Sequence, residues 1–156
     1  MNIQQVYNIY RETSFNKSRF DREVRDWLTN GHEERRYQFD LNNDNNIFFD
    51  LGAMYGNWSD RMLNTYGGTS HLFEVVPEFN DIIYTKYGKD DKYKIVNKGL
   101  AHETYTADLP VGTPTDSTTL IDSPTGSYIP VDMISVSDYL AQENISTVDV
   151  LKINIE

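Results

Sequence analysis

The chain has 156 residues, the size of one domain, and 38% of them are hydrophobic, so it can bury a core. Its formal net charge of −10 repels phosphate backbones, so we expect no nucleic-acid partner. The sequence shows no cysteine, no signal-peptide pattern and no apolar run near the roughly 20 residues of a membrane helix, so we expect a cytoplasmic protein without disulfides, thiolate metal sites or membrane contact.

We expect residues 1–45 to form a helical extension. In SRFDREVRDWLTNG, apolar side chains recur at the spacing of one helix face, which Ser18 can cap and Gly31 can end. That face consists of Phe20, Val24, Trp27 and Leu28. The segment IQQVYNIYRE also reads as helical. These helices are expected to pack beside a larger unit, residues 46–156, or to cover its cleft.

From Ile47 onward, strand patterns alternate with helix patterns. The expected strands are 47–52, 71–76, 93–101 and 148–156. The expected helices are 57–66, stopped by Gly67-Gly68, then 77–88, opened by Pro77, and 135–145, capped by a serine. The polar region from Thr104 to Pro130 is either a set of short strands or a long surface loop. Such alternation implies right-handed crossovers and a mostly parallel sheet, so the fold class is α/β and Rossmann-like.

The exit from the first strand, DLGAMYG, is the most informative stretch. In a parallel sheet of this kind, ligands bind beyond the carboxyl ends of the strands, where this stretch is expected to lie. Gly52 and Ala53 carry almost no side chain, so a ligand can approach the backbone, and Gly56 permits unusual backbone angles or close packing. Asp50 supplies a negative charge. The simplest alternative is that the glycines only form a tight turn.

Two cofactors could use this turn. A dinucleotide usually requires G-x-G-x-x-G, whereas this chain has G-A-x-x-G, and Asp50 would repel a diphosphate. S-adenosylmethionine carries no phosphate, and its cationic groups tolerate an acid. Glu74, at the end of the second strand, could accept hydrogen bonds from both ribose hydroxyls. These features favour S-adenosylmethionine over NAD, while the alternative interpretation of Glu74 is a solvated strand end.

Three stretches, in this order, resemble the FkbM-type S-adenosylmethionine-dependent methyltransferases. FFDLGAMYGNWS is similar to the family's cofactor turn, D-x-G-A-x-x-G. HLFEVVPEFNDII is similar to its second strand, F-E-P-x-P, from which Val75-Val76 depart. SVSDYLAQENISTVDVLKINIE resembles the late segment in which a short helix leads to a strand of the form L-K-I-D-x-E-G. The third stretch is the most particular to the family.

The resemblance implies a set of site residues. The implied cofactor contacts are Asp50, Gly52, Ala53, Gly56, Glu74, Gly99 and Leu100, with Glu74 on the ribose and residues 97–100 near the adenine. The implied catalytic residues, beside the methyl group and the acceptor, are Asn154 and Glu156; the family usually has aspartate at the first of these positions. No metal site is expected, and His32, His71 and His102 are interpreted as ordinary surface or strand-end residues.

The activity implied by the resemblance is O-methylation of a sugar or another small-molecule hydroxyl. Two other functions stay open: a degenerate, non-catalytic interaction module, consistent with Asn154, and an NAD-dependent oxidoreductase. Because the family pattern continues with a glycine and further strands, we expect the sheet to be truncated at Glu156 and the chain to be the N-terminal portion of a longer protein. The oligomeric state stays open.

Overall fold

The computed structural model describes residues 25–41, 44–110 and 128–155, and the chain divides into two units between Asp40 and Leu41. In the first unit, residues 25–29 are helical and end in a turn at residues 30–31, as predicted, before a short helix, α3 (His32–Arg35). The earlier part of the predicted helical extension, residues 1–24, lies outside the described residues. Within the described ranges, no helix is long and apolar enough to cross a membrane.

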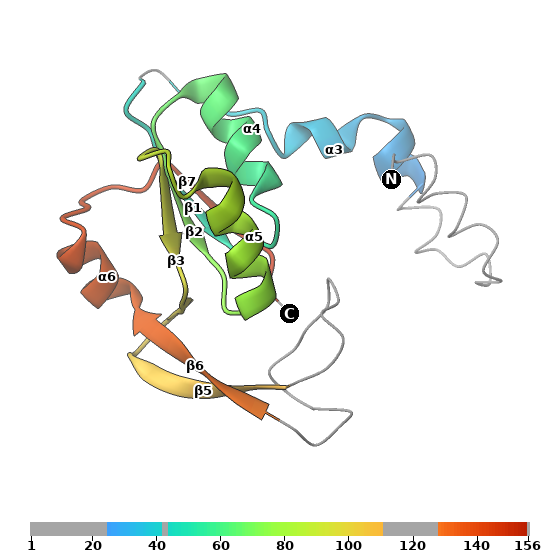
Figure 1. The fold of residues 1–156 in the computed structure, drawn as a ribbon. Coiled ribbons are helices and arrows are strands. Elements are labelled where there is room, and N and C mark those ends of the chain that lie inside the picture. The colour runs from blue at the N-terminus through green and yellow to red at the C-terminus, as the bar shows by residue number, and fades with distance from the viewer. Residues whose placement is uncertain (1–24, 42–43, 111–127, 156) are drawn as a thin grey trace, which may run out of the picture. The chain divides into compact units, whose positions relative to one another are not determined.

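The second unit is built on four parallel strands. β1 (Ile47–Leu51) lies between β2 (Thr69–Phe73) and β7 (Val150–Ile153), and β3 (Tyr93–Val96) forms an edge beside β2. Figure 1 shows these strands running side by side. The predicted α/β class with a mostly parallel sheet is therefore confirmed.

Each of the three helices of this unit begins or ends at a signal that the sequence predicted. α4 (Asn57–Tyr66) ends at Gly67, whose N–H donates to the Leu63 carbonyl at 3.0 Å. α5 (Pro77–Tyr87) has its proline in the first turn, where no backbone N–H is needed. α6 (Val136–Gln142) begins after Ser135, whose Oγ accepts a hydrogen bond from the Asp138 N–H at 3.0 Å.

Alternation along the strands divides the core between the two faces of the sheet. Phe48, an even-numbered residue of β1, packs edge-on against Trp58 of α4, with ring centroids 6.2 Å apart. The odd-numbered Phe49 and Phe73 pack on the opposite face against Tyr139 of α6, with centroids 5.8 and 4.8 Å from its ring. α4 and α5 therefore cover one face of β1 and β2 and α6 the other, whereas Leu151 and Ile153 of β7 are exposed.

A second, smaller sheet was not predicted. The stretch 93–101, expected as one strand, is two, because the chain turns where the Lys98 N–H donates to the Val96 carbonyl at 2.8 Å. β4 (Gly99–Ala101) then pairs with β6 (Tyr128–Ser135), and β5 (Tyr105–Pro110) pairs antiparallel with β6. The polar region therefore contributes strands at both of its ends, while residues 111–127 lie outside the described residues.

The smaller sheet packs against the link between β2 and α5. Its inward-facing Leu109 and Val131 form a buried cluster with Val76 and Phe79, and Met54 packs against that cluster. Burial of these side chains stabilises the chain immediately after β2. The smaller sheet thereby helps to position Glu74 and the turn that follows β1.

Candidate functional site

The chain leaves β1 through a turn that is held against the end of β2. The backbone N–H groups of Gly52 and Ala53 both donate to the Phe73 carbonyl, at 3.0 and 3.1 Å. Gly52 has a φ of 71°, and a Cβ added there would lie 2.1 Å from the backbone oxygen of Asn154. The position requires glycine for its left-handed backbone and for the close approach of the chain after β7. On this side, the space beside Gly52 is filled by the protein itself.

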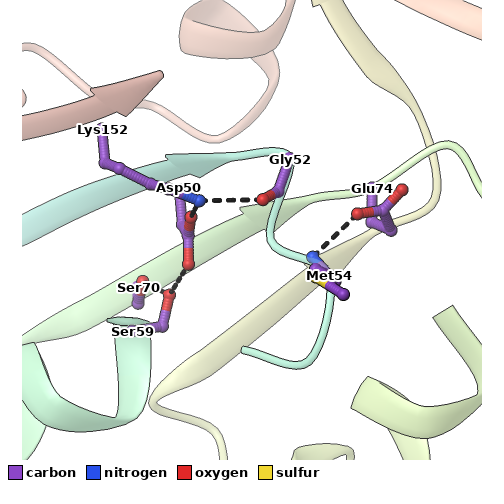
Figure 2. Close-up of polar contacts among 7 residues, drawn as sticks. All are labelled: Asp50, Gly52, Met54, Ser59, Ser70, Glu74 and Lys152. Atoms are coloured by element: carbon purple, nitrogen blue, oxygen red, sulfur yellow. Dashed lines mark hydrogen bonds and ion pairs between the residues drawn. The ribbon is translucent and has the colours of Figure 1, made fainter. Parts of the chain in front are cut away.

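Glu74 directly follows β2 and joins two backbone segments. Its Oε2 accepts a hydrogen bond from the Met54 N–H at 2.8 Å (Figure 2). Its Oε1 accepts one from the Val76 N–H at 2.9 Å. Met54 has a φ of 53°, a left-handed conformation uncommon for a residue other than glycine, and the bond to Glu74 stabilises it. Because Glu74 is only 6% exposed, its interpretation as a solvated strand end is wrong.

Asp50 lies in a fully buried polar cluster rather than on the open side of the turn. Its Oδ1 pairs with Lys152 Nζ at 2.8 Å, and its Oδ2 accepts from Ser59 Oγ at 2.8 Å, which in turn accepts from Ser70 Oγ at 2.8 Å. Asp50 is 0% exposed. The argument that its charge would repel a diphosphate is therefore wrong, because Lys152 neutralises it. Direct contact of Asp50 with a cofactor stays a prediction.

Lys152 was missed by the sequence analysis. It is the register partner of Asp50 on the adjacent strand, and its Nζ also donates to the Gly52 carbonyl at 2.8 Å. Its side chain remains 18% exposed. The signal in the sequence was an acid and a base at equivalent places in two apolar strands, IFFDL and VLKI. That signal has meaning only when β1 and β7 are known to be neighbours.

Ala53 and Gly56 complete the turn, and both face the protein interior. Ala53 is 5% exposed and packs in a buried cluster with Leu72 and Ile83. Gly56 is the N-cap of α4 with a φ of 70°, and a Cβ added there would lie 2.7 Å from the Tyr87 ring. Packing within the protein therefore accounts for both small residues, and their predicted contact with a cofactor is untested.

The other predicted site residues do not all lie at the turn. Asn154 follows β7, and its N–H donates to the Leu51 carbonyl at 3.0 Å, which places it beside the turn. Gly99 belongs to β4, and a Cβ added there would lie 3.2 Å from the side chain of Val75, next to Glu74. Leu100 packs against the core cluster on the α6 face. Glu156 lies outside the described residues.

His71 is a core residue, so its interpretation as a surface or strand-end histidine is wrong. It is 4% exposed, and its Nδ1 lies 2.8 Å from the hydroxyl of Tyr139. Burial lowers the pKa of His71 to about 4, with smaller effects of Glu143, which raises the pKa, and Lys94, which lowers it. Burial also raises the pKa of Tyr139. Both side chains are neutral at pH 7 and form a structural pair, whereas His102 is exposed, as predicted.

A cavity of about 510 Å³ runs along the edge strand β3, between α5 and α6. Its lining includes Asn97, which the resemblance placed near an adenine, but not the turn after β1. Asn80 connects the two regions, because its Nδ2 donates to the Glu74 carbonyl at 2.7 Å and to Asn97 Oδ1 at 2.7 Å. The carboxyl ends of β2 and β3 are therefore tied together through one amide.

Comparison with known proteins agrees with this architecture. A search of curated proteins and a search of solved structures each gave no match. The family model described as "Methyltransferase FkbM domain" matches residues 50–156, which begin at Asp50 and include the turn, Glu74 and β7. The chain therefore belongs to the FkbM methyltransferase family.

Proposed function

We propose that this protein binds S-adenosylmethionine across the carboxyl ends of β2, β1 and β7 and transfers its methyl group to a hydroxyl of a sugar or another small molecule. The observation that carries the proposal is the position of Glu74: a buried carboxylate at the end of β2, in contact with the turn that leaves β1. Membership of the FkbM methyltransferase family supports the same reaction class.

The groups around the turn suit a ligand with a sugar at one end. An ionised carboxylate has about four lone-pair sites, and Glu74 uses two of them for the N–H groups of Met54 and Val76. Its remaining acceptor capacity suits two ribose hydroxyls. Because Asp50 is paired with Lys152, preference for S-adenosylmethionine over a dinucleotide rests on Glu74 and on the family, not on a free negative charge.

S-adenosylmethionine supplies an activated methyl group on a positively charged sulfur. The protein's task is to hold donor and acceptor in line at roughly 3 Å and to exclude water, since the leaving group needs no further activation. A hydroxyl acceptor also loses its proton, which passes to solvent once the methyl group is transferred, because an amide oxygen aligns the hydroxyl but is too weakly basic to take the proton. Asn154, exposed and beside the turn, is the described residue that we assign to orienting the acceptor hydroxyl through its amide oxygen.

The first test is calorimetric titration of the full chain with S-adenosylhomocysteine, the product form of the cofactor, and with NAD. We expect binding of S-adenosylhomocysteine, loss of that binding in Gly52→Val, and no binding of NAD. Gly67→Val is the matched control, because Gly67 has a similar φ of 67° at the other end of α4. Binding of NAD alone would instead support an oxidoreductase.

The second test is transfer of radiolabelled methyl groups from S-adenosylmethionine to a panel of saccharides and small phenols. Incorporation of the labelled methyl group into a saccharide, with loss of one of its free hydroxyls, supports O-methylation. Tight binding of S-adenosylhomocysteine without methyl transfer to any compound of the panel would contradict that choice of acceptors. It would favour the non-catalytic interaction module. Failure of the wild-type chain to bind S-adenosylhomocysteine would overturn the proposal as a whole.

A further inference from the structure

Lys152 is held beside the turn by two acceptors. Its Nζ lies 2.8 Å from Asp50 Oδ1 and 2.8 Å from the Gly52 carbonyl oxygen, and both acceptors belong to the chain leaving β1 (Figure 2). These contacts fix the position of the ammonium group, although Lys152 and the turn are separated by 100 residues or more in sequence. A lysine held in this way is already ordered before any ligand binds.

The ammonium group has a third N–H to donate. A lysine carries three donors, and within the described part of the chain Lys152 uses two. Its side chain is 18% exposed, whereas that of Asp50 is 0% exposed, so the pair reaches solvent only on the lysine side. A ligand that approaches this buried ion pair therefore meets Lys152 and not Asp50.

The first three N–H groups of the turn, those of Gly52, Ala53 and Met54, are not available to an anion. The N–H groups of Gly52 and Ala53 donate to the Phe73 carbonyl, and that of Met54 donates to Glu74. These backbone donors, which a glycine-rich turn would normally present to an anionic ligand, are already used. A carboxylate lying beside residues 52–54 therefore needs a donor from outside this stretch, and Lys152 is a charged one in contact with it.

The two charged side chains lie on opposite sides of the turn. Glu74 contacts it at Met54 from the β2 side, and Lys152 contacts it at Gly52 from the β7 side (Figure 2). A ligand lying across the strand ends therefore meets an acceptor at one end and a cationic donor at the other. This polarity matches a molecule with sugar hydroxyls at one end and a carboxylate at the other.

We infer that the third N–H of Lys152 binds the carboxylate at the amino-acid end of the methyl donor. The inference rests on the proposed function and adds a cofactor-binding residue to it. Asp50 then acts as a positioning residue, because it orients the ammonium group instead of touching the ligand. A charge-assisted hydrogen bond of this kind is one of the stronger polar contacts available to a ligand.

The test compares two ligands that differ at the amino-acid end. S-adenosylhomocysteine has the carboxylate, whereas 5′-methylthioadenosine keeps the nucleoside and lacks the amino-acid end. For Lys152→Met, we expect the affinity for S-adenosylhomocysteine to fall about tenfold or more, while the affinity for 5′-methylthioadenosine stays within about twofold. Decarboxylated S-adenosylhomocysteine, which retains the ammonium group, should bind wild type and Lys152→Met equally.

Lys86→Met is the matched control. Lys86 also donates to a carbonyl of the same turn, that of Tyr55 at 3.2 Å, but it is exposed and not paired with Asp50. We expect it to bind all three ligands as wild type does. An equal loss for S-adenosylhomocysteine and 5′-methylthioadenosine in Lys152→Met would show a purely structural role and overturn the inference. If wild type binds neither ligand, the proposed function fails as well.

A second measurement does not depend on the folding of Lys152→Met. In wild-type protein labelled with ¹⁵N at lysine, the Nζ resonance of Lys152 is identified by its absence from Lys152→Arg. We expect this resonance to shift on addition of S-adenosylhomocysteine and to stay in place on addition of 5′-methylthioadenosine at the same saturation. Identical shifts with both ligands would contradict a contact with the carboxylate.

Discussion

Glu74 accepts a hydrogen bond from the Met54 N–H at 2.8 Å, across 20 residues of sequence. With its second oxygen on the Val76 N–H at 2.9 Å, the same carboxylate holds together the turn after β1 and the link after β2. Both segments are placed before any ligand binds. A residue predicted only as a ligand contact is therefore also a structural bridge, and the two roles can be separated by experiment.

We expect Glu74→Ala to destabilise the fold and to abolish or greatly weaken binding of S-adenosylhomocysteine. The substitution leaves two backbone N–H groups without their acceptor, which costs about 2 kcal/mol or more. Urea unfolding followed by circular dichroism measures the free energy, and titration calorimetry measures binding. Glu103→Ala, at an exposed carboxylate, is the control and should stay within about 0.5 kcal/mol of wild type. Wild-type affinity in Glu74→Ala would remove this residue from the proposed site.

Gly52→Ala should be more destabilising than Gly67→Ala, although both glycines have a positive φ, 71° and 67°. At Gly67, where ψ is −171°, the nearest atom to a new Cβ lies 3.3 Å away, so we expect a cost of about 2 kcal/mol from the backbone alone. At Gly52 the new Cβ would lie 2.1 Å from the Asn154 oxygen, so the chain after β7 must move and the cost rises to about 3 kcal/mol or more. Equal costs by urea unfolding would mean that this close approach is unimportant.

Local patterns predicted the elements around the site, because each carries its own start and stop signals. The apolar run of β1, the glycine at the end of α4 and the proline at the start of α5 needed no knowledge of distant residues. The smaller sheet was missed because no glycine or proline precedes the turn at Lys98. The stretch 93–101 was therefore interpreted as one strand. His71 was misplaced because a polar residue in a strand gives no sign of a buried partner such as Tyr139.

The partnership of Asp50 and Lys152 could not be predicted for a different reason. The two residues are separated by 102 positions, and only the order of strands in the sheet makes them neighbours. We expect Asp50→Asn to destabilise the protein by about 3 kcal/mol, because it leaves a largely buried ammonium group without a counter-ion. Lys152→Met should have a similar effect, since it leaves the buried carboxylate unpaired.

The double variant Asp50→Asn with Lys152→Met is the informative member of this set. If the two residues act as a pair, it should lose clearly less stability than the sum of the two single variants, because neither charge remains unpaired. Urea unfolding of all four proteins under one set of conditions gives the coupling free energy. Additive effects would show that the ion pair contributes nothing beyond its separate side chains.

Stability should fall as the pH is lowered from about 6.5 to about 4, and His71 should cause part of that fall. Burial lowers the pKa of His71 in the folded protein to about 4, from 6.5 in the unfolded chain. Between these values the unfolded state binds the proton more readily, so the contribution of His71 to the free energy of unfolding rises with pH through this window and is level on either side of it. The full contribution corresponds to about 3 kcal/mol.

The unfolding free energy of each variant, measured from pH 7 to pH 4, checks this expectation. Carboxylate groups titrate in all of the variants, so a difference in slope between them reports on the histidine. His71→Phe is expected to be less stable than wild type at pH 7, because the Tyr139 hydroxyl loses its partner, yet to show a shallower slope as the pH falls. His102→Gln, at an exposed histidine, should retain the wild-type slope. A slope in His71→Phe as steep as in wild type would show that the buried imidazole does not govern acid stability, since its protonation is then not linked to unfolding.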